Sequence, residues 1–425
     1  MIYISFSNIL SKSIGMKNGI SESKFNSLCT KNQPLVQEVF RAKNKDGYDF
    51  LNLPNNTSIV RKIKKFVDEQ AKNKWQKIVV LGIGGSALGT IAANSALNSG
   101  HERHKLHVLD NIDPDYISDF LENINISKTL FVVISKSGST VEPMALYGLV
   151  KEKLADKFPN NYQKHFVFIT DPKKGLLRKI AKEEGITAFD ISPKIGGRFS
   201  VLSSAGLVPL ALAGVDIGAL LRGAREMREA IKKMKSAKNP ALTLALSQFF
   251  MDIKRGKAMT VLMPYSSKLS RFSDWYRQLL AESIGKNKKT GPTPINALGT
   301  TDQHSQLQLY AEGPNNKLII FFRILRHKSD PKLGDIMPKE LSYLNDKKLS
   351  NILDAAYVGT AESLTAKKRP NLTVEVPKVD AKNLGALFML FEFQVALLGL
   401  MYKVDAFNQP GVEHGKQITK KLLSK

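Results

Sequence analysis

Short apolar runs rich in β-branched residues alternate with stretches whose apolar residues recur every three or four positions. In the amino-terminal half, the runs predict strands over residues 77–82, 105–109, 130–134, 165–170 and 186–191. The intervening stretches predict helices near 86–98, 114–122, 141–156 and 174–184. Because the strands are continuously apolar, we expect an α/β fold with a parallel sheet covered by helices on both faces.

A second α/β unit follows in the carboxyl-terminal half. Its predicted strands are 259–263, 318–324 and 372–376, and its predicted helices lie near 267–284, 347–367 and 381–402. The segment 203–214 predicts a helix that closes the first unit, and the charged segment 220–236 predicts a connecting helix. The Gly/Pro-rich segment 285–316 is expected to form a long loop, and loops of that length are often functional.

These elements predict five parts in chain order. They are an N-terminal segment 1–50, a first α/β domain 51–215, a helical connector 216–240, a second α/β domain 241–402 and a C-terminal arm 403–425. The arm is expected to begin as a loop and to end in a basic helix.

The composition is that of an ordinary globular protein, with 43% hydrophobic and 24% charged residues among 425. No window holds 18 uninterrupted apolar residues, so we expect no membrane span. The first residues lack the basic stretch and cleavage site of a signal peptide. Cys29 is the single cysteine and cannot form an internal disulfide. Together these features favour the cytoplasm.

The net charge of +25 is unusual and would attract phosphorylated metabolites or other anions. Basic residues are spread over the whole length, and neither a nucleic-acid-binding motif nor interleaved aromatic residues accompany them. We therefore expect a lysine-rich surface and no specific nucleic-acid partner.

The most informative segment reads LFVVISKSGSTVE, from Leu130 to Glu142. A buried strand stops at small hydroxyl residues, and a helix follows them. The turn runs from Ser135, Lys136 and Ser137 through Gly138 and Ser139 to Thr140, with four hydroxyls and a lysine in six residues. Unpaired amide groups and the positive end of the helix dipole make such a turn an anion pocket, so we expect a phosphate or sugar phosphate.

The first strand-to-helix turn reads GIGGSALG and includes Gly85 and Ser86. It matches the Gly-x-Gly-x-x-Gly/Ala dinucleotide pattern, and Asp110 ends the next strand 23 residues later. An NAD-dependent oxidoreductase is therefore an alternative. Against it, a second phosphate-type loop follows the third strand, and a dinucleotide enzyme rarely needs both.

Other candidate residues lie further along the chain. In KIGGRFS, Gly197 lets the backbone approach a ligand, and Arg198 supplies a permanent positive charge. Gln278 and Glu282 are four residues apart, so they share one helix face, and Glu282 is a candidate general base. His304 lies in the long predicted loop and could transfer a proton at neutral pH.

The segment FNQPGVEHGK holds the last two candidates, Gln409 and Lys416. No group of cysteine, histidine and carboxylate residues has the spacing of metal ligands, so we expect no metal.

Together the motifs GIGGSALG, SKSGST, GGRFS, AESIGK, QHS and FNQPGVEHGK resemble the glucose-6-phosphate isomerase (phosphoglucose isomerase) family in its shorter bacterial form. They follow the family's order over residues 82 to 416. The resemblance implies two sugar-isomerase (SIS) α/β domains, each a mostly parallel sheet with helices on both faces, plus a C-terminal arm. It also implies reversible isomerisation of glucose 6-phosphate and fructose 6-phosphate in glycolysis and gluconeogenesis, with no cofactor and no metal.

The resemblance implies a role for each candidate residue. Ser135, Lys136, Ser137 and Thr140 would hold the phosphate, with Gly85 and Ser86 nearby. Glu282 would move the proton between C2 and C1, and Arg198, beside Gly197, would stabilise the cis-enediolate. His304 and Lys416 would help to open the sugar ring, and Gln278 and Gln409 would contact the substrate.

In this family the site histidine comes from the neighbouring subunit, so the resemblance implies a homodimer with shared active sites. Three alternatives stay open at this point. They are a bifunctional glucose/mannose phosphate isomerase, an NAD-dependent oxidoreductase and a non-catalytic sugar-phosphate sensor.

Overall fold

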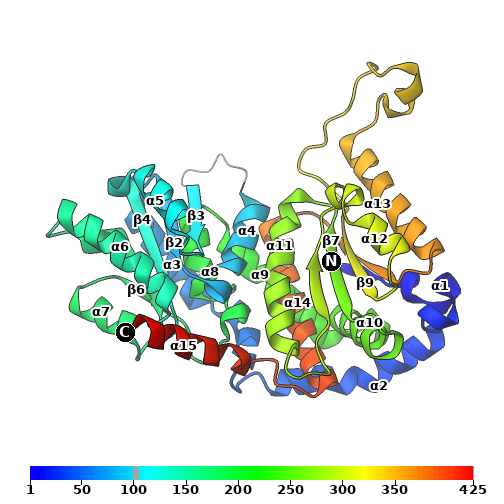
Figure 1. Ribbon diagram of the computed structural model, residues 1–425, viewed down its shortest axis with the longest axis horizontal. Coiled ribbons are helices and arrows are strands. Elements are labelled where there is room, and N and C mark those ends of the chain that lie inside the picture. The colour runs from blue at the N-terminus through cyan, green and yellow to red at the C-terminus, as the bar shows by residue number, and fades with distance from the viewer. Residues whose placement is uncertain (99–104, 425) are drawn as a thin grey trace. The chain divides into compact units, whose positions relative to one another are not determined.

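The computed structural model describes residues 1–98 and 105–424 (Figure 1). Their contacts divide the chain into two compact units, each described here by itself. Unit 1 comprises Met1–Arg41, Met227–Asn383 and Met389–Lys425, and unit 2 comprises Ala42–Glu226 and Leu384–Phe388.

Unit 2 is built on a parallel five-stranded sheet. Its strands are β2 (Lys77–Leu81), β3 (Lys105–Leu109), β4 (Thr129–Ile134), β5 (Phe166–Thr170) and β6 (Ala188–Asp190), in the order β3-β2-β4-β5-β6. Its helices are α3 (Thr57–Ala71), α4 (Leu88–Leu97), α5 (Pro114–Glu122), α6 (Val141–Lys157), α7 (Leu176–Glu183) and α8 (Ser204–Leu212). The helix α9 (Ile217–Lys233) crosses the boundary between the units in the sequence.

Helices cover both faces of this sheet (Figure 1). Alternate side chains of a strand point to opposite faces. Phe131 and Val133 of β4 pack with apolar residues of α5, α6 and α7 in one core cluster. On the other face α8 contacts β2, and α3 and α4 both contact α8. All six residues of β4 are buried, which is why its sequence lacks polar alternation.

Unit 1 holds a second five-stranded sheet. Its strands are β1 (Tyr3–Ser5), β7 (Met259–Pro264), β8 (Thr293–Asn296), β9 (Lys317–Ile324) and β10 (Asn371–Val376), in the order β1-β10-β9-β7-β8. Only β1 is antiparallel to its neighbour among the strands of the described residues. Its helices are α1 (Ser11–Asn18), α2 (Glu22–Arg41), α10 (Pro240–Arg255), α11 (Ser270–Ile284), α12 (Leu307–Glu312), α13 (Leu349–Ala366), α15 (Glu413–Leu423) and all of α14 (Ala381–Tyr402) except Leu384–Phe388.

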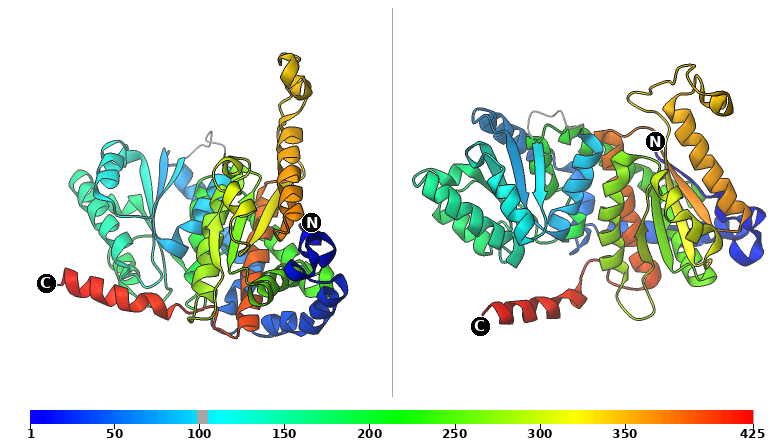
Figure 2. Two further views of the ribbon diagram at one scale, coloured as in Figure 1. Left: turned by 45° about the vertical axis from the view of Figure 1, so that its right-hand side comes forward. Right: turned by 45° about the horizontal axis from the view of Figure 1, so that its top comes forward.

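Two segments of unit 1 lie outside its core. The segment between β9 and α13 extends away from the sheet and carries the short 3₁₀ helix η10 (Lys339–Leu344) (Figure 2). Every residue of α15 is exposed. Both segments therefore contribute little to the core of this unit.

The four parallel strands of unit 1 follow the same path as the first four of unit 2. Counted along the chain, the second parallel strand of each unit (β3 or β8) lies on one side of the first (β2 or β7). The third and fourth parallel strands lie on the other side of the first. This is the flavodoxin-like strand order, and it differs from the order of the dinucleotide-binding fold. The strand order reverses between β2 and β4 and again between β7 and β9, and ligands bind at the carboxyl ends of strands at such points.

The predicted fold class is confirmed, because both sheets are mostly parallel and flanked by helices. The predicted strands lie within two residues of the observed ones, although β6 is shorter than the predicted 186–191 and His165 precedes β5 in a 3₁₀ turn. The prediction of a long loop over 285–316 is wrong, because this segment contains β8 and α12. The strand β8 was not predicted because Thr293–Asn296 contains a proline and is too short to show a periodic pattern.

The helix α14 is long and apolar enough to cross a membrane by length and composition alone. However, 89% of its most apolar 18-residue window is buried inside the protein. It packs against unit 1's sheet, where the rings of Phe391 and Phe322 stack with centroids 5.6 Å apart.

Candidate active site

The loop between β4 and α6 carries three side-chain hydroxyl groups that lie close together, called here the hydroxyl ring. Ser135 is 2% exposed, and its Oγ lies 3.0 Å from Oγ1 of Thr140. The amide of Gly138 donates to Ser135 Oγ over 3.1 Å, and Ser137 Oγ lies 3.4 Å from Thr140 Oγ1. Gly138 has a φ of +66°, which allows the tight turn that gathers these groups. Three side-chain hydroxyls therefore converge just after the carboxyl end of β4.

The same loop ends at the amino terminus of α6. Thr140 occupies the N-cap position, yet its own side chain makes no capping hydrogen bond to the first turn of this 17-residue helix. Uncapped amide groups and the positive end of the helix dipole attract an anion. Together with the hydroxyl ring, they make this loop a site suited to a phosphate group.

Lys136 is hydrogen-bonded to a segment of unit 2 that lies far away in the sequence. Its Nζ donates to the carbonyl oxygens of Pro193 and Ile195 over 3.3 and 3.0 Å. Burial lowers the pKa of its ammonium group, and the charge of Asp171 partly opposes that shift. Lys136 thus ties the hydroxyl loop to the segment that precedes Gly196–Gly197–Arg198, and its charge stays beside the loop.

Two glycine-rich loops of unit 2 touch backbone to backbone. They contain the 3₁₀ turns η3 (Gly84–Ser86) and η6 (Gly197–Phe199). A Cβ atom on Gly85 would lie 2.2 Å from the carbonyl carbon of Gly197. The hydroxyl of Ser200 also donates to the carbonyl oxygens of Gly85 and Gly197, over 3.3 and 2.7 Å. Only glycine at position 85 permits this approach.

Arg198 is held in place by this contact. It is 2% exposed, and its guanidinium carbon lies 5.7 Å from the centre of the Phe199 ring. That ring packs against Phe50, with centroids 5.2 Å apart. The permanent charge is therefore fixed in position next to the turn that follows β2.

The structure brings the eight candidates of unit 2 to one edge of its sheet. The loops after β2 and β4 lie where the strand order reverses. Gly85 joins the first of these loops to the loop of Arg198, and Lys136 joins the second to it. This set is Gly85, Ser86, Ser135, Lys136, Ser137, Thr140, Gly197 and Arg198. Asp110, the acidic residue of the dinucleotide pattern, is exposed after β3.

The remaining candidates belong to unit 1, and three of them, Gln278, Glu282 and Gln409, lie toward the end of α11. Gln278 Nε2 donates to Glu282 Oε1 over 2.9 Å, and Gln278 Oε1 is buried without a hydrogen-bond partner among residues 1–98 and 105–424. Lys286, just after α11, donates from Nζ to the carbonyl oxygen of Asn408. This bond places Gln409 near the end of α11.

Lys416 lies in the first turn of α15, a few residues after Gln409. Its Nζ forms an exposed ion pair of 2.8 Å with Glu413. Exposed pairs of this kind contribute little to stability, so the ammonium group is easily released for another partner.

His304 lies at the opposite edge of the unit 1 sheet from Glu282. It ends the 3₁₀ turn η9 (Thr301–His304) after the carboxyl end of β8, where Gly299 N donates to Pro264 O over 3.0 Å. The 15-residue helix α11 starts at that edge and runs back across the sheet over about 22 Å. Glu282 sits in its last turn, so these two residues of one chain lie far apart.

A buried polar network holds α11 in place. Tyr276 OH donates to Gln248 Oε1 of α10 over 3.1 Å, and Gln394 Nε2 of α14 donates to the same oxygen. Gln248 Nε2 in turn donates to Thr260 Oγ1 of β7 over 2.8 Å. All four residues are at most 1% exposed. Sequence reasoning missed this network, because its members lie inside apolar stretches without a recognisable motif.

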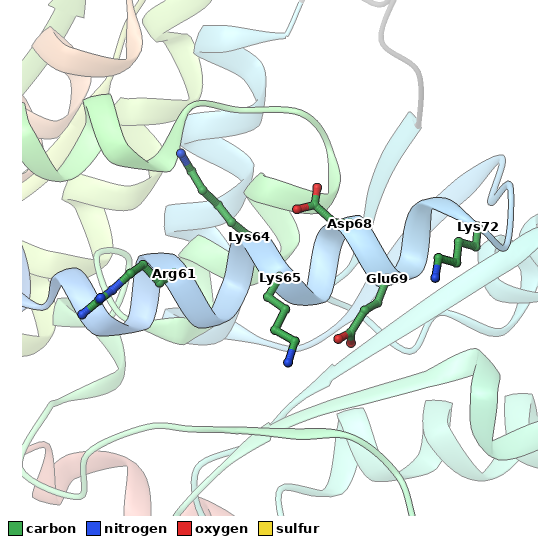
Figure 3. Close-up of a pocket in the computed structure, with 6 residues that line it drawn as sticks. All are labelled: Arg61, Lys64, Lys65, Asp68, Glu69 and Lys72. Atoms are coloured by element: carbon green, nitrogen blue, oxygen red, sulfur yellow. The ribbon is translucent and has the colours of Figure 1, made fainter.

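A surface hollow on α3 is unrelated to these residues (Figure 3). It is lined by Arg61, Lys64, Lys65, Asp68, Glu69 and Lys72. Lys64 and Asp68 point to one side of the helix, and Lys65 and Glu69 point to the other. The side chains do not converge on one ligand position. Within residues 1–98 and 105–424, no three His, Cys, Asp or Glu side chains cluster as metal ligands would.

Comparison with known proteins gives consistent results. The family model of phosphoglucose isomerase matches residues 29–425. The chain is 38% identical to a glucose-6-phosphate isomerase of Carboxydothermus hydrogenoformans, and the match covers 99% of this chain and 94% of that relative. It is also 37% identical to a glucose-6-phosphate isomerase of Thermus thermophilus, over 88% of this chain and 90% of the relative.

Two crystal structures have the same fold. A hypothetical protein from Thermus thermophilus superposes with a TM-score of 0.90 at 33% identity, and the match covers 100% of both chains. A glucose-6-phosphate isomerase from Chlamydia trachomatis superposes with a TM-score of 0.81 at 23% identity, over 95% of this chain and 85% of that chain.

The contact between the glycine loops can be tested with Gly85→Ala. The added methyl group must push the two backbones apart, so we expect a loss of about 1–3 kcal/mol in the free energy of unfolding. Affinity for inorganic phosphate should fall at least about tenfold, which is 1.4 kcal/mol. Urea unfolding and titration calorimetry measure both.

Gly148→Ala is the matched control for Gly85→Ala. Gly148 lies inside α6 with nothing within 4 Å of an added Cβ, so alanine should be neutral or stabilise by up to about 1 kcal/mol. Wild-type stability and phosphate affinity in Gly85→Ala would contradict the proposed role of the contact.

The polar network can be tested with Tyr276→Phe, Gln394→Leu and the double variant. Tyr276→Phe should cost about 1 kcal/mol of unfolding free energy, and Gln394→Leu should cost more because it also changes the volume of a packed side chain. Because the residues share one acceptor, the double variant should deviate from additivity by at least about 0.5 kcal/mol. Urea unfolding measures the cycle, with exposed Tyr116→Phe as the control; strict additivity would argue against a network.

Proposed function

Because the chain belongs to the phosphoglucose isomerase family, we propose that it interconverts glucose 6-phosphate and fructose 6-phosphate. The family resemblance of its sequence motifs is confirmed by the family match over residues 29–425 and by relatives at 38% identity over nearly the whole chain. The reaction belongs to glycolysis and gluconeogenesis.

The observation that carries this function is the phosphate site between β4 and α6. Hydroxyls of Ser135, Ser137 and Thr140 surround an uncapped helix terminus, which suits a phosphate dianion. The phosphate of a hexose 6-phosphate does not react. Its binding energy can therefore hold C1 and C2 of the sugar against the reacting groups.

The chemistry requires one base that moves a proton between neighbouring carbons. We assign that base to Glu282. Its carboxylate removes the proton from C2 of the open-chain aldose, and the electron pair forms the C1–C2 double bond and leaves the negative charge on O1 of a cis-enediolate. The proton of the C2 hydroxyl passes to O1, and the proton held on the carboxylate is returned to C1 as the C2 oxygen becomes the carbonyl, so no electron acceptor is consumed. General base catalysis of this kind contributes about 10²–10⁴-fold.

We assign to Arg198 the stabilisation of the negative charge that develops on the enediolate. Its burial and its packing on Phe199 fix the guanidinium before substrate binds, so little reorganisation is needed in the transition state. Gln278 and Gln409 are assigned to sugar hydroxyls. The unpartnered, buried Oε1 of Gln278 supports that assignment, because a sugar hydroxyl can donate to it.

Ring opening is assigned to His304 and Lys416, which can transfer protons to and from the ring oxygen and O1. Within one chain, His304 and Glu282 lie at opposite edges of the unit 1 sheet. This separation supports a homodimer in which each site combines Glu282 of one subunit with His304 of the other. His304 is exposed, as a residue offered to a partner must be.

We place the enzyme in the cytoplasm. Cys29, the single cysteine, is buried, and burial raises the pKa of its thiol to about 12. A buried thiol with a raised pKa stays protonated at neutral pH, and a single cysteine forms no internal disulfide, which suits a reducing compartment.

The strand order argues against the alternative of an NAD-dependent oxidoreductase. Its glycine pattern lies in a sheet with flavodoxin-like strand order. Purified protein should therefore convert fructose 6-phosphate to glucose 6-phosphate with no added cofactor. Detection of glucose 6-phosphate after quenching follows the reaction, and parallel tests with mannose 6-phosphate address the bifunctional alternative.

Glu282→Gln should lower kcat by at least about 10²-fold while KM changes little, because the amide keeps the shape and loses the base. Glu362→Gln, an exposed glutamate of α13, is the matched control and should keep full activity. A Glu282→Gln enzyme with wild-type kcat would show that the base is another residue.

The shared site can be tested by mixing two inactive variants, Glu282→Gln and His304→Ala. In a mixed dimer, one site receives both defects and the other receives none. Random exchange of subunits should therefore restore about a quarter of wild-type activity. Differently tagged chains verify the exchange; mixed dimers without recovered activity would mean that each site uses residues of one chain.

A further inference from the structure

We infer that unit 1 has a second anion site, at the amino-terminal edge of its sheet, that binds a phosphate-type oxyanion. The site consists of Arg255, Lys257, Lys317 and Arg369. None of these residues is assigned a role in the isomerase reaction.

The sheet register brings three of the four cations together. Lys317 begins β9 and pairs with Met259 of β7, so Lys257 lies two residues ahead of that pair. Asn371 of β10 pairs with Ile319, which places Arg369 level with Lys317 on the neighbouring strand. Adjacent strands lie about 4.8 Å apart. These cations therefore start from neighbouring backbone positions.

Their hydrogen bonds converge on residues 311–316, which are the end of α12 and the loop after it. Lys257 Nζ donates to the carbonyl and side-chain oxygens of Asn315 over 2.6 and 2.9 Å. Lys317 Nζ donates to Asn316 Oδ1 over 2.7 Å and to Pro314 O over 3.2 Å. Arg369 Nε donates to Ala311 O over 2.9 Å. All of these acceptors are neutral.

Arg255 joins the cluster through the end of α1. Its Nε donates to Gly19 O over 2.9 Å and its Nη2 to Met16 O over 3.2 Å. Asn315 Nδ2 lies 3.2 Å from Asn18 Oδ1, so the same loop connects both groups.

The cluster has little compensating negative charge among the described residues. Lysine is rarely buried unless it is paired, yet Lys257 and Lys317 are 4% and 7% exposed. None of the four cations forms an ion pair with a carboxylate of residues 1–98 or 105–424. Glu312 interacts with Arg369 through its charge, but it is hydrogen-bonded to Lys367. One acidic group thus faces an excess of cations.

Burial and repulsion by the neighbouring cations both destabilise the charged form of Lys257. Burial lowers the pKa of its ammonium group to about 8, and the charges of Arg369 and Arg255 add to the effect. Burial and Arg369 also lower the pKa of Lys317. An anion bound among these groups would remove the repulsion, so the free cluster is poised to take one up.

The donors still available are of the kind that bind a tetrahedral oxyanion. Arg369 is half-buried, and its two Nη nitrogens have no hydrogen-bond partner among the described residues. A guanidinium fork of this kind binds phosphate oxygens in pairs. Each buried lysine uses two of its three N–H donors on the loop, which leaves one for a ligand.

Thermal unfolding of the full chain tests this site. The rise in Tm caused by inorganic phosphate, and separately by pyrophosphate, is compared with that in chloride of equal ionic strength. Arg369→Gln should reduce the rise at least twofold. Arg326→Gln removes an exposed arginine outside the cluster and should leave the rise unchanged. Equal rises in wild type and Arg369→Gln would overturn the proposal.

A second measurement does not depend on any variant. In protein with ¹³C-labelled lysine, the titration of Lys257 is followed by NMR with and without pyrophosphate. A bound anion should raise the pKa of Lys257, and an unchanged titration would overturn the site. Isomerase activity of Arg369→Gln should equal that of wild type, so the site and the proposed function can fail independently.

Discussion

The backbone contact between Gly85 and Gly197 is the constraint on which the phosphate-binding half of the protein depends. It places the turn after β2 against the loop that carries Arg198, and a side chain at position 85 would separate them. Lys136 then fastens the hydroxyl loop after β4 to the same segment. A parallel sheet brings the ends of β2 and β4 to one edge, and these contacts turn that edge into a fixed binding surface.

The two units share one strand order but contribute differently to the proposed site. Unit 2 supplies residues from the carboxyl edge of its sheet, where α/β folds usually bind ligands. Unit 1 supplies Glu282 from the last turn of α11, which lies at the amino edge of its sheet, and His304 from the carboxyl edge. The same topology has thus been used in two ways, and the separation of Glu282 from His304 within one chain is the ground on which the homodimer is proposed.

The sequence predicted the parallel strands and the phosphate loop because both leave local patterns. The buried run before Ser135 and the small hydroxyl residues after it are contiguous in the chain. The carbonyl partners of Lys136 could not be predicted, because Pro193 and Ile195 lie almost sixty residues away. Neither the Gln248–Tyr276–Gln394 network nor the cation cluster at Lys257 leaves a local pattern, since each joins elements that only the tertiary fold brings together.

The central claim is that a carboxylate on α11 moves a proton, and not a hydride, between two carbons of the sugar. Isomerisation in deuterium oxide tests it most directly, because a proton held on Glu282 can exchange with solvent before it is returned. The account predicts deuterium at C2 of glucose 6-phosphate formed from fructose 6-phosphate, detected by NMR. Full turnover with no deuterium in the product would contradict it.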